Sequence, residues 1–221
     1  MHINILTIFP EIFDALNYGV IGKAKTNKSF SIKIQDIRDY PVNKHGQIDS
    51  KPYGGGEGMV MMAEPLKRSL ESIPKEKLGK IIYLSPQGAL FDNTKAKKLS
   101  KEPSATFICG RYEGIDQRFI DKYVDEEISI GDFIISGGEI AALCIIDSII
   151  RHIPGVLGNK DSSKNDSFSN GLLKGPQYSR PEVFEEISVP DILLSGDKKI
   201  KEWKDLKSIE ATIIRRPDLL N

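Results

Sequence analysis

The stretch EISIGDFIISGGEIAALCIIDSIIR (127–151) decides the fold that we expect for this chain of 221 residues. Its first residues alternate between apolar and polar, as in a strand. The chain then passes a second apolar run at 133–135 and turns on Ser136-Gly137-Gly138, and an apolar helix begins near Glu139. A strand that leads through a glycine loop into a helix is the building unit of an α/β sheet.

Two other stretches share this order of strand and loop. They are IIYLSPQG (81–88) and FICGRYEGID (107–116), and in each an apolar run enters a loop with glycine or proline. Open α/β sheets bind ligands outside the carboxyl ends of their parallel strands. We therefore expect the three loops to meet at one edge of a sheet and to form a pocket lined by backbone groups.

The remaining chain supplies further strands and helices in alternation. We expect strands at residues 2–9, 30–37, 81–85 and 106–109, helices at 11–17, 63–72, 93–100 and 197–216, a turn around Gly19 and Gly22, and a polar, glycine-rich loop at 38–59. This alternation predicts an α/β fold with a largely parallel sheet.

The composition changes after Leu157, where GNKDSSKNDSFSNG (158–171) is polar and rich in small residues. Such a composition is typical of a linker, and it leaves open whether the segment is a passive tether or carries function. We expect a main domain at 1–160, an interdomain linker at 161–171 and a small, mainly helical domain at 172–221.

Net charge, cysteine positions and the lengths of the apolar runs limit the kinds of protein that this chain can be. Lys plus Arg and Asp plus Glu number 31 each, so any basic surface for a nucleic acid must be local. Cys109 and Cys144 lie in apolar runs and suit buried small side chains, and no Cys and His spacing is typical of a metal site. The start of the chain resembles a first strand and not a signal peptide, and no apolar run reaches the roughly 18 residues of a membrane span. We expect a cytoplasmic protein.

No standard phosphate-binding glycine motif or nucleophile elbow occurs, so the candidate chemistry rests on charged residues at loop and helix ends. A carboxylate can act as a general base, and a guanidinium can stabilise a developing oxyanion. The candidates are Arg111, Glu113, Arg151, Asp161 and Asp166. Spacing alone favours structural roles, because Arg151 can pair with Asp147 four residues earlier and Asp166 can cap a helix.

Eight strings together carry a family resemblance. KPYGGGEGM, YLSPQG, CGRYEGID, SIGDFIISGGE, RHIPGVLGN, DSFSNGLL, YSRPEVF and LLSGD resemble, in order and spacing, the bacterial tRNA (guanosine-37-N1) methyltransferase family, the TrmD proteins. The resemblance runs from the N-terminus to about residue 220. It implies a deep C-terminal trefoil knot in the main domain, which periodicity alone does not predict because threaded chains are nearly absent from proteins. It also implies a homodimer.

The resemblance further implies a methyl donor, S-adenosyl-L-methionine, held by the three loops through backbone groups. The implied cofactor-binding residues are Tyr83, Leu84, Ser85, Pro86, Gly110, Tyr112, Glu113, Gly114, Ile130, Gly131, Asp132, Phe133, Ile134, Ile135, Gly137 and Gly138. Asp166 falls on the family's catalytic aspartate and Arg151 on its partner arginine. Glu113 matches a residue connected with Mg²⁺ dependence.

The implied substrate is tRNA, methylated at N1 of guanosine 37. Candidate RNA contacts are the loop at 36–59 and the basic side chains of the last fifty residues. Many members of the family continue for a helix or more beyond RRPDLL (215–220), where this sequence ends one residue later, so we expect weaker C-terminal RNA contacts. Two alternatives remain: a knotted methyltransferase for another RNA position, and a non-catalytic module that binds an adenosyl group or nucleotide.

Overall fold

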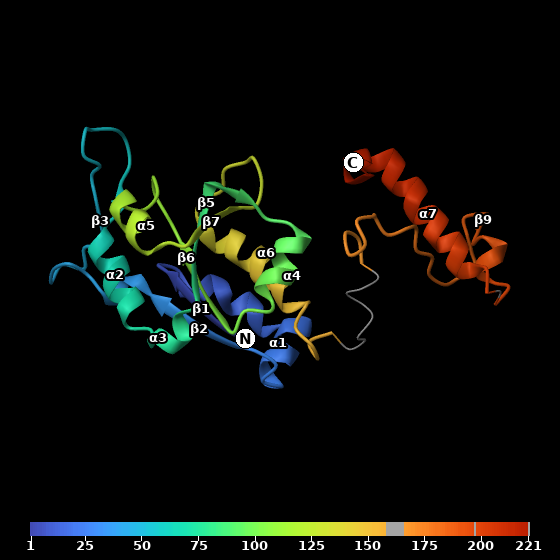
Figure 1. Cartoon of the computed structure of the whole chain (residues 1–221), viewed down its shortest axis with the longest axis horizontal. Coiled ribbons are helices and arrows are strands. Elements are labelled where there is room, and N and C mark those ends of the chain that lie inside the picture. Colours follow the sequence, from blue (N-terminus) through green and yellow to red (C-terminus); the bar gives the residue numbers. More distant parts are fainter. Residues whose placement is uncertain (158–165, 197, 221) are drawn as a thin grey trace. The chain divides into compact units, whose positions relative to one another are not determined.

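A computed structural model describes residues 1–157, 166–196 and 198–220, and it divides into one unit at Met1–Gly158 and a second at Asn159–Asn221. The first unit contains β1 (His2–Thr7), η1 (Pro10–Asn17), α1 (Gly19–Thr26), β2 (Ser31–Asp36), η2 (Ile37–Asp39), β3 (Asp49–Ser50), β4 (Val60–Met61), α2 (Ala63–Glu71), α3 (Lys75–Leu78), β5 (Lys80–Leu90), α4 (Asn93–Leu99), β6 (Ser104–Cys109), α5 (Gln117–Tyr123), β7 (Glu126–Ser129) and α6 (Gly138–Ile150) (Figure 1). Here η marks a 3-10 helix.

A five-stranded sheet in the order β2-β1-β6-β5-β7 organises the first unit, and each of its pairings is parallel. This confirms the expected α/β fold with a parallel sheet. The order places the ends of β6, β5 and β7 next to one another. Between Leu84 and Ala89 the pairing of β5 with β7 shifts register, so the Ser-Pro-Gln-Gly segment leaves the ladder and returns to it.

Apolar residues on both faces of the strands build two separate cores. Ile82 and Leu84 of β5 belong to one core, and Ile81 and Tyr83 belong to the other, because successive side chains of a strand point to opposite faces. Helices α1, α4 and α6 supply side chains to the first core, and α2 and α5 to the second. Figure 1 shows these two groups of helices on opposite sides of the sheet. The sheet is therefore covered on both faces, as parallel sheets are.

Helix α6 explains why the stretch at 127–151 dominates the sequence pattern. Eight of its thirteen residues are buried, and six of these, from Ala141 to Ile150, are alanines or isoleucines of the first core. A helix that is apolar on most sides needs a core around it. Its amino end follows the glycine turn that leads out of β7, so the same helix anchors the third loop.

Several expectations about local structure are wrong. Gly19 and Gly22 do not punctuate a turn but lie in α1, where a Cβ on Gly22 would come within 2.1 Å of the carbonyl oxygen of Asn17. Cys144, which was expected to be buried, is exposed on α6. The apolar run at 133–135 lies in a loop, where Ile134 is 82% exposed. Helix α5 and the short β3–β4 pair lie in segments without clear periodicity, so sequence patterns did not predict them.

The second unit contains β8 (Val183–Phe184), β9 (Ile187–Ser188), η3 (Asp191–Leu193), α7 (Ile200–Arg215) and η4 (Pro217–Leu220). Within the predicted linker, residues 158–165, including the candidate Asp161, lie outside the described residues. From Asp166 onward the chain forms a turn and then runs along α7. The backbone amides of Leu173 and Gly175 donate to Thr212 Oγ1 at 2.9 Å and Ser208 Oγ at 3.0 Å, so this segment is fixed to the helix.

Candidate active site

The three loops that follow β5, β6 and β7 meet around one cavity of about 310 Å³. Because these strands are neighbours and parallel, their carboxyl ends open on the same edge of the sheet. The volume lies at the lower end of the range found for small-molecule sites. The cavity thus has the position and the size of a cofactor pocket.

The cavity brings together all but one of the residues expected to hold a cofactor. Asp132 is exposed and does not line it, and its assignment stays a prediction. The lining also contains residues that the expected set lacks. The predicted residues in the lining are Tyr83, Leu84, Ser85, Pro86, Gly110, Tyr112, Glu113, Gly114, Ile130, Gly131, Phe133, Ile134, Ile135, Gly137 and Gly138, and the additional ones are Gln87, Arg111, Ile128, Ser129, Ser136 and Ala141.

Glycines allow the loops to approach one another without side chains in between. A Cβ on Gly110 would lie 2.8 Å from the ring of Tyr83, and one on Gly138 would lie 2.8 Å from the Cα of Cys109. The amide of Gly138 donates to the carbonyl of Gly110 at 2.9 Å, which joins the second and third loops directly. Any larger residue at these positions would have to push a loop into the cavity or away from it.

Tyr83, in β5, packs its side chain against the second loop. Burial, and secondarily the nearby Glu127 carboxylate, raises the pKa of Tyr83 to about 12, although the amide of Ile115 donates to its phenol oxygen. The side chain is therefore neutral throughout the physiological range. Its buried ring, in contact with Gly110 and Gly114, sets the separation of β5 from the second loop.

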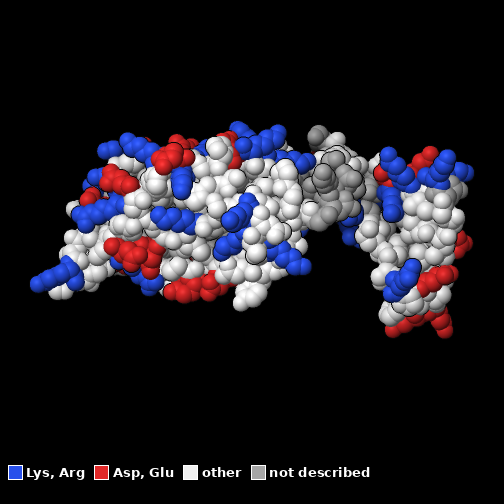
Figure 2. Space-filling model, turned by 90° about the horizontal axis from the view of Figure 1, so that it is seen from below, with Lys and Arg blue, Asp and Glu red and all other residues white. Residues whose placement is uncertain are grey.

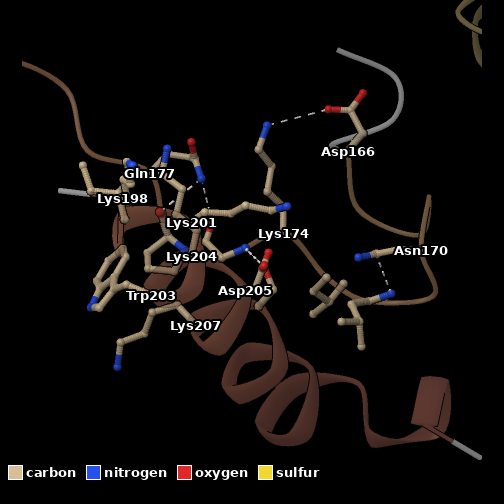
Figure 3. A pocket seen from close by; sticks show the side chains of 16 residues that line it. Asp166, Asn170, Lys174, Gln177, Lys198, Lys201, Trp203, Lys204, Asp205 and Lys207 are labelled. Atoms are coloured by element: carbon tan, nitrogen blue, oxygen red, sulfur yellow. Dashed lines mark hydrogen bonds and ion pairs between the residues drawn. The ribbon is translucent and has the colours of Figure 1, made fainter. Parts of the chain in front are cut away.

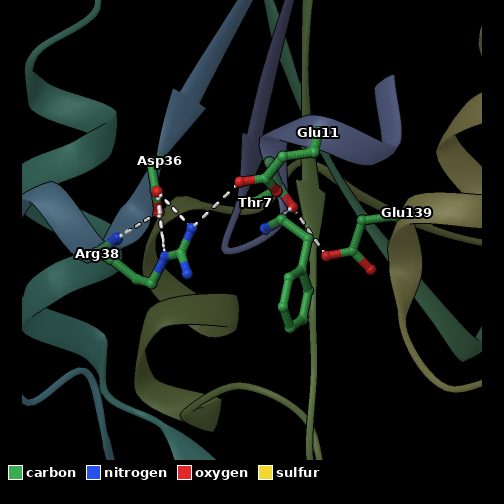
Figure 4. A network of polar contacts seen from close by, with 6 residues as sticks. Thr7, Glu11, Asp36, Arg38 and Glu139 are labelled. Atoms are coloured by element: carbon green, nitrogen blue, oxygen red, sulfur yellow. Dashed lines mark hydrogen bonds and ion pairs between the residues drawn. The ribbon is translucent and has the colours of Figure 1, made fainter. Parts of the chain in front are cut away.

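A buried network of polar side chains connects α6 with the second and third loops, which line the cavity. Glu139, in the first turn of α6, is fully buried and accepts from Arg111 Nε at 2.8 Å and from Thr7 Oγ1 at 2.8 Å. Figure 4 shows the Glu139 carboxylate facing Thr7, at the end of β1. Arg111 also donates to the carbonyl of Ser136 at 3.1 Å, so one guanidinium links the second loop, the third loop and α6. A negative charge at a helix amino terminus is stabilised by the helix dipole.

Sequence reasoning selected Arg111 as a charged candidate but did not pair it with Glu139. The two residues lie 28 positions apart, and only the fold brings them together. The available signal was an acidic residue directly after the Gly137-Gly138 turn, the position that a helix dipole favours. The structure makes this ion pair a support of the loops.

The glycine-rich loop between β3 and β4 lies against Glu113. A Cβ on Gly58 would come within 2.6 Å of Glu113 Oε1, and the amide of Glu113 donates to the carbonyl of Met59 at 2.9 Å. Gly54, Gly55, Gly56 and Gly58 all have positive φ, which few other residues adopt. Tyr53, near the tip of this loop, is 98% exposed.

The expected catalytic pair stays a prediction, because Arg151 and Asp166 belong to different units. Arg151 follows the carboxyl end of α6, whereas the cavity lies at its amino end. Thirteen residues at a rise of 1.5 Å put these ends about 20 Å apart. Asp166 belongs to the second unit, where its Oδ1 lies 3.9 Å from Lys174 Nζ.

Among the described residues, no three His, Cys, Asp or Glu side chains gather as metal ligands would. Glu113 is the acidic side chain in the lining of the cavity. Mg²⁺ commonly uses one or two carboxylates together with water and substrate oxygens. The single carboxylate of Glu113 therefore fits a magnesium site only if water and substrate supply the other ligands. No helix in the described part of the chain has the length and apolar character to cross a membrane.

Comparisons with known proteins show a family. The family model described as tRNA (Guanine-1)-methyltransferase TrmD matches residues 1–221. The chain is 50% identical over 220 residues to a tRNA (guanine-N(1)-)-methyltransferase of Clostridium novyi (strain NT), covering 99% of this chain and 91% of that protein. Proteins with the same name from Clostridium beijerinckii (strain ATCC 51743 / NCIMB 8052) and Clostridium perfringens (strain SM101 / Type A) are 49% and 48% identical, covering 99% of this chain and 92% and 93% of their own lengths.

Proposed function

The chain belongs to the tRNA (guanine-1)-methyltransferase TrmD family, and we propose that it transfers a methyl group from S-adenosyl-L-methionine to N1 of guanosine 37 in tRNA. The relatives that it resembles over nearly their whole length carry the name tRNA (guanine-N(1)-)-methyltransferase. A methyl group next to the anticodon helps to maintain the reading frame, and an enzyme with this substrate acts in the cytoplasm.

The observation that carries the proposal is the cavity formed by the three loops. Its walls combine close backbone, at Gly110 and Gly138, with apolar side chains such as Phe133 and Ile134. Backbone amides and carbonyls can read the polar edge of an adenine, and the apolar side chains can cover its faces. The residues present therefore fit an adenosyl ligand, with Asp132 as the predicted contact that does not line the cavity.

Proton removal is the task that falls to the chain's own residues. N1 of guanine carries a proton and is a poor nucleophile until it loses it. In our proposal Asp166 accepts this proton while Arg151 stabilises the charge that develops on O6. The bound donor supplies a methyl group on a positively charged sulfur, and this sulfur leaves as a neutral thioether without an acid. The guanine must first leave its stack, as in other enzymes that modify bases.

The position of Arg151 supports a homodimer. Ala141 of α6 lines the cavity, and the ten residues from Ala141 to Arg151 span about 15 Å. This distance keeps Arg151 away from a guanine whose N1 faces a methyl group in the cavity of its own chain. We infer that Arg151 serves the cavity of a second copy, which agrees with the dimer that the resemblance implies. The trefoil knot also belongs to this proposal.

RNA binding in this proposal rests on phosphate contacts and on shape. Lys51 in the glycine-rich loop and the basic side chains of the second unit are the candidate contacts, because the net charge of the whole chain is zero. Binding to phosphates releases counterions, so affinity for tRNA should fall steeply with salt. A flat salt response would contradict this mode of docking.

Glu113 is the residue that would hold Mg²⁺, if the reaction depends on it. Its carboxylate lies between the cavity and the glycine-rich loop, where substrate oxygens can complete the ligand set. A magnesium ion there would supply charge stabilisation. Methylation by Glu113→Gln at increasing Mg²⁺ concentration tests this role, and an unchanged Mg²⁺ dependence would contradict it.

The proposed function is tested by methylation of one unmodified tRNA transcript with radiolabelled donor. We expect one methyl group per transcript, and we expect no label when guanosine 37 is replaced by adenosine. Label on another position would favour a related knotted methyltransferase with a different RNA target. No label on any RNA, with the donor bound, would favour a non-catalytic adenosyl-binding module.

A further inference from the structure

The loop between β3 and β4 carries an aromatic side chain that lies almost entirely in water. Tyr53 is 98% exposed, more than any other large apolar or aromatic side chain in the described part of the chain. Figure 1 shows this loop, residues 51–59, projecting from the first unit. Single exposed apolar side chains are common on protein surfaces, so exposure alone does not indicate a site. What distinguishes Tyr53 is that its loop is anchored beside the cavity of the first unit.

Backbone hydrogen bonds join the base of this loop to the second of the three loops that line the cavity. The amide of Glu113 donates to the carbonyl of Met59 at 2.9 Å, and the amide of Met61 donates to the carbonyl of Gly114 at 3.0 Å. The side chain of Met61 is fully buried, so this end of the loop is fixed. The tip of the loop is therefore held at a limited distance from the cavity.

The tip itself is open, and its distance from the cavity is short. Gly54 and Gly55 have positive φ, and a Cβ on either would meet no atom within 4 Å. Tyr53 precedes Gly58 by five residues, and a Cβ on Gly58 would touch Glu113 of the cavity lining. Five extended residues span at most about 18 Å. The ring of Tyr53 is thus close enough to contact a nucleotide that neighbours the one in the cavity.

Charge alone does not explain how this part of the first unit would hold RNA. The loop contains one basic residue, Lys51, and one acidic residue, Glu57. Figure 2 shows basic and acidic side chains interspersed over the visible face of the first unit. In the second unit, by contrast, several lysines line a cavity of about 670 Å³ (Figure 3). RNA at the loop therefore needs an interaction besides a phosphate contact of Lys51.

An aromatic ring supplies such an interaction, because every base has a flat π face on which a ring can stack. Unpaired bases in RNA loops are recognised largely in this way. An enzyme that takes a base out of its stack also deprives the neighbouring base of a stacking partner, which costs free energy. A ring beside the cavity can replace that partner. The glycines after Tyr53 allow the loop to orient the ring against the base.

We propose that Tyr53 stacks on an unpaired base next to the guanosine that enters the cavity, and that it replaces the stacking that this base loses when the guanosine flips out. The inference rests on the proposed function, because it takes the substrate to be an RNA loop with a flipped guanosine. It adds a residue of the first unit that positions RNA without charge. Tyr53 does not line the cavity, so it affects RNA binding and not donor binding.

Three substitutions at position 53 of the full-length chain separate stacking from a general apolar contact. Tyr53→Ala should lower the affinity for an unmodified tRNA transcript about tenfold, and Tyr53→Leu should lose a similar amount because leucine has no π face. Tyr53→Phe keeps the ring and should stay within about twofold of the wild type. Donor affinity, measured by titration calorimetry, should be unchanged in all three, because the side chain is exposed outside the cavity. Wild-type affinity for tRNA in Tyr53→Ala or in Tyr53→Leu would overturn the stacking.

Fluorescence of 2-aminopurine, placed at either neighbour of guanosine 37, reports the stacking directly, because stacking on an aromatic ring quenches it. The measurement uses S-adenosyl-L-homocysteine in place of the donor, so that no methyl group is transferred. At one of the two positions we expect weaker fluorescence with the wild type and Tyr53→Phe than with Tyr53→Ala. Equal fluorescence with the wild type and Tyr53→Ala at both positions would overturn this inference alone, if the wild type methylates guanosine 37. Absence of that methylation would instead contradict the proposed function.

Discussion

The cavity of the first unit and the Asp166 turn of the second unit differ in how they are built. Around the cavity, three loops are held by buried contacts, by close glycine backbone and by the Arg111–Glu139 pair. At the turn, the amides of Leu173 and Gly175, which follow it, bond to α7, and the partly exposed Asp166 carboxylate lies 3.9 Å from Lys174 Nζ. The ligand cavity is complete within the first unit. The proposed proton-transfer site is not, because its two residues, Arg151 and Asp166, belong to different units.

The first prediction addresses the turn and has the largest expected effect. Asp166→Asn keeps the size of the side chain but removes the base, so methyl transfer in a single turnover should fall by about 10²–10⁴-fold. Donor binding, measured by titration calorimetry, should stay unchanged because Asp166 does not line the first cavity. A loss of rate below about tenfold would contradict the role of general base.

The second prediction tests how firmly the cavity is supported. Arg111→Met leaves the buried Glu139 carboxylate without its cation and should lower the free energy of unfolding by about 3–5 kcal/mol in urea denaturation. Arg68→Met, which removes an exposed pair with Glu64, is the matched control and should cost less than about 1 kcal/mol. Equal effects of the two substitutions would show that the network does not support the loops.

The third prediction tests the close approach of the loops. Gly110→Ala places a methyl group against the buried ring of Tyr83 and should weaken donor binding about tenfold, in line with the roughly 1–3 kcal/mol cost of overpacking. Ser136→Ala, on the rim of the same cavity, adds no atoms and should bind the donor like the wild type. Wild-type affinity in Gly110→Ala would mean that the loops can separate without affecting the ligand.

The fourth prediction concerns Glu126 of β7, a strand of the central sheet, and has the smallest expected effect. Glu126 is partly buried, which opposes its ionisation, but hydrogen bonds from Lys80 and Lys95 outweigh burial and lower its pKa. The folded protein therefore binds this proton less readily than the unfolded chain, and the stabilisation is present above the ordinary value of 4.5 and lost as the pH falls through the lowered pKa.

Glu126→Gln should consequently lower the free energy of unfolding by about 1 kcal/mol at pH 7, and the difference from the wild type should vanish in acid. Urea denaturation at pH 7 and at pH 3 measures both values. Glu71→Gln, beside Lys67 on the surface of α2, is the control and should change stability less at pH 7. A difference that persists at pH 3 would contradict the assigned cause.

The contrast between the two regions also explains what the sequence could predict. Apolar alternation predicted β1, β2 and β7, and continuous apolar runs predicted β5 and β6, whose side chains are covered on both faces of the sheet. Helix α1 was missed because Gly19 and Gly22 indicate a turn, yet Gly22 is needed for its contact with Asn17. Such a contact has no local signature.

The candidate site was predictable to a similar degree. Glycine loops and the family resemblance located the cavity lining, but not the pairing of Arg111 with Glu139, which depends on contacts between distant segments. The segment at 166–171, expected as part of a linker, forms a turn on the second unit instead of a plain tether. Leu173 and Gly175, which follow this turn, bond to Thr212 and Ser208 near the far end of the chain.

Hydrogen exchange followed by mass spectrometry tests the central claim most directly, because it reports on both regions in one experiment. With S-adenosyl-L-methionine alone, we predict slower exchange in peptides that cover 83–86, 110–114 and 130–138, and no change in 166–177. Addition of tRNA should then slow exchange in 166–177. Protection by the donor that falls outside the three loops, or that appears first around Asp166, would contradict the account.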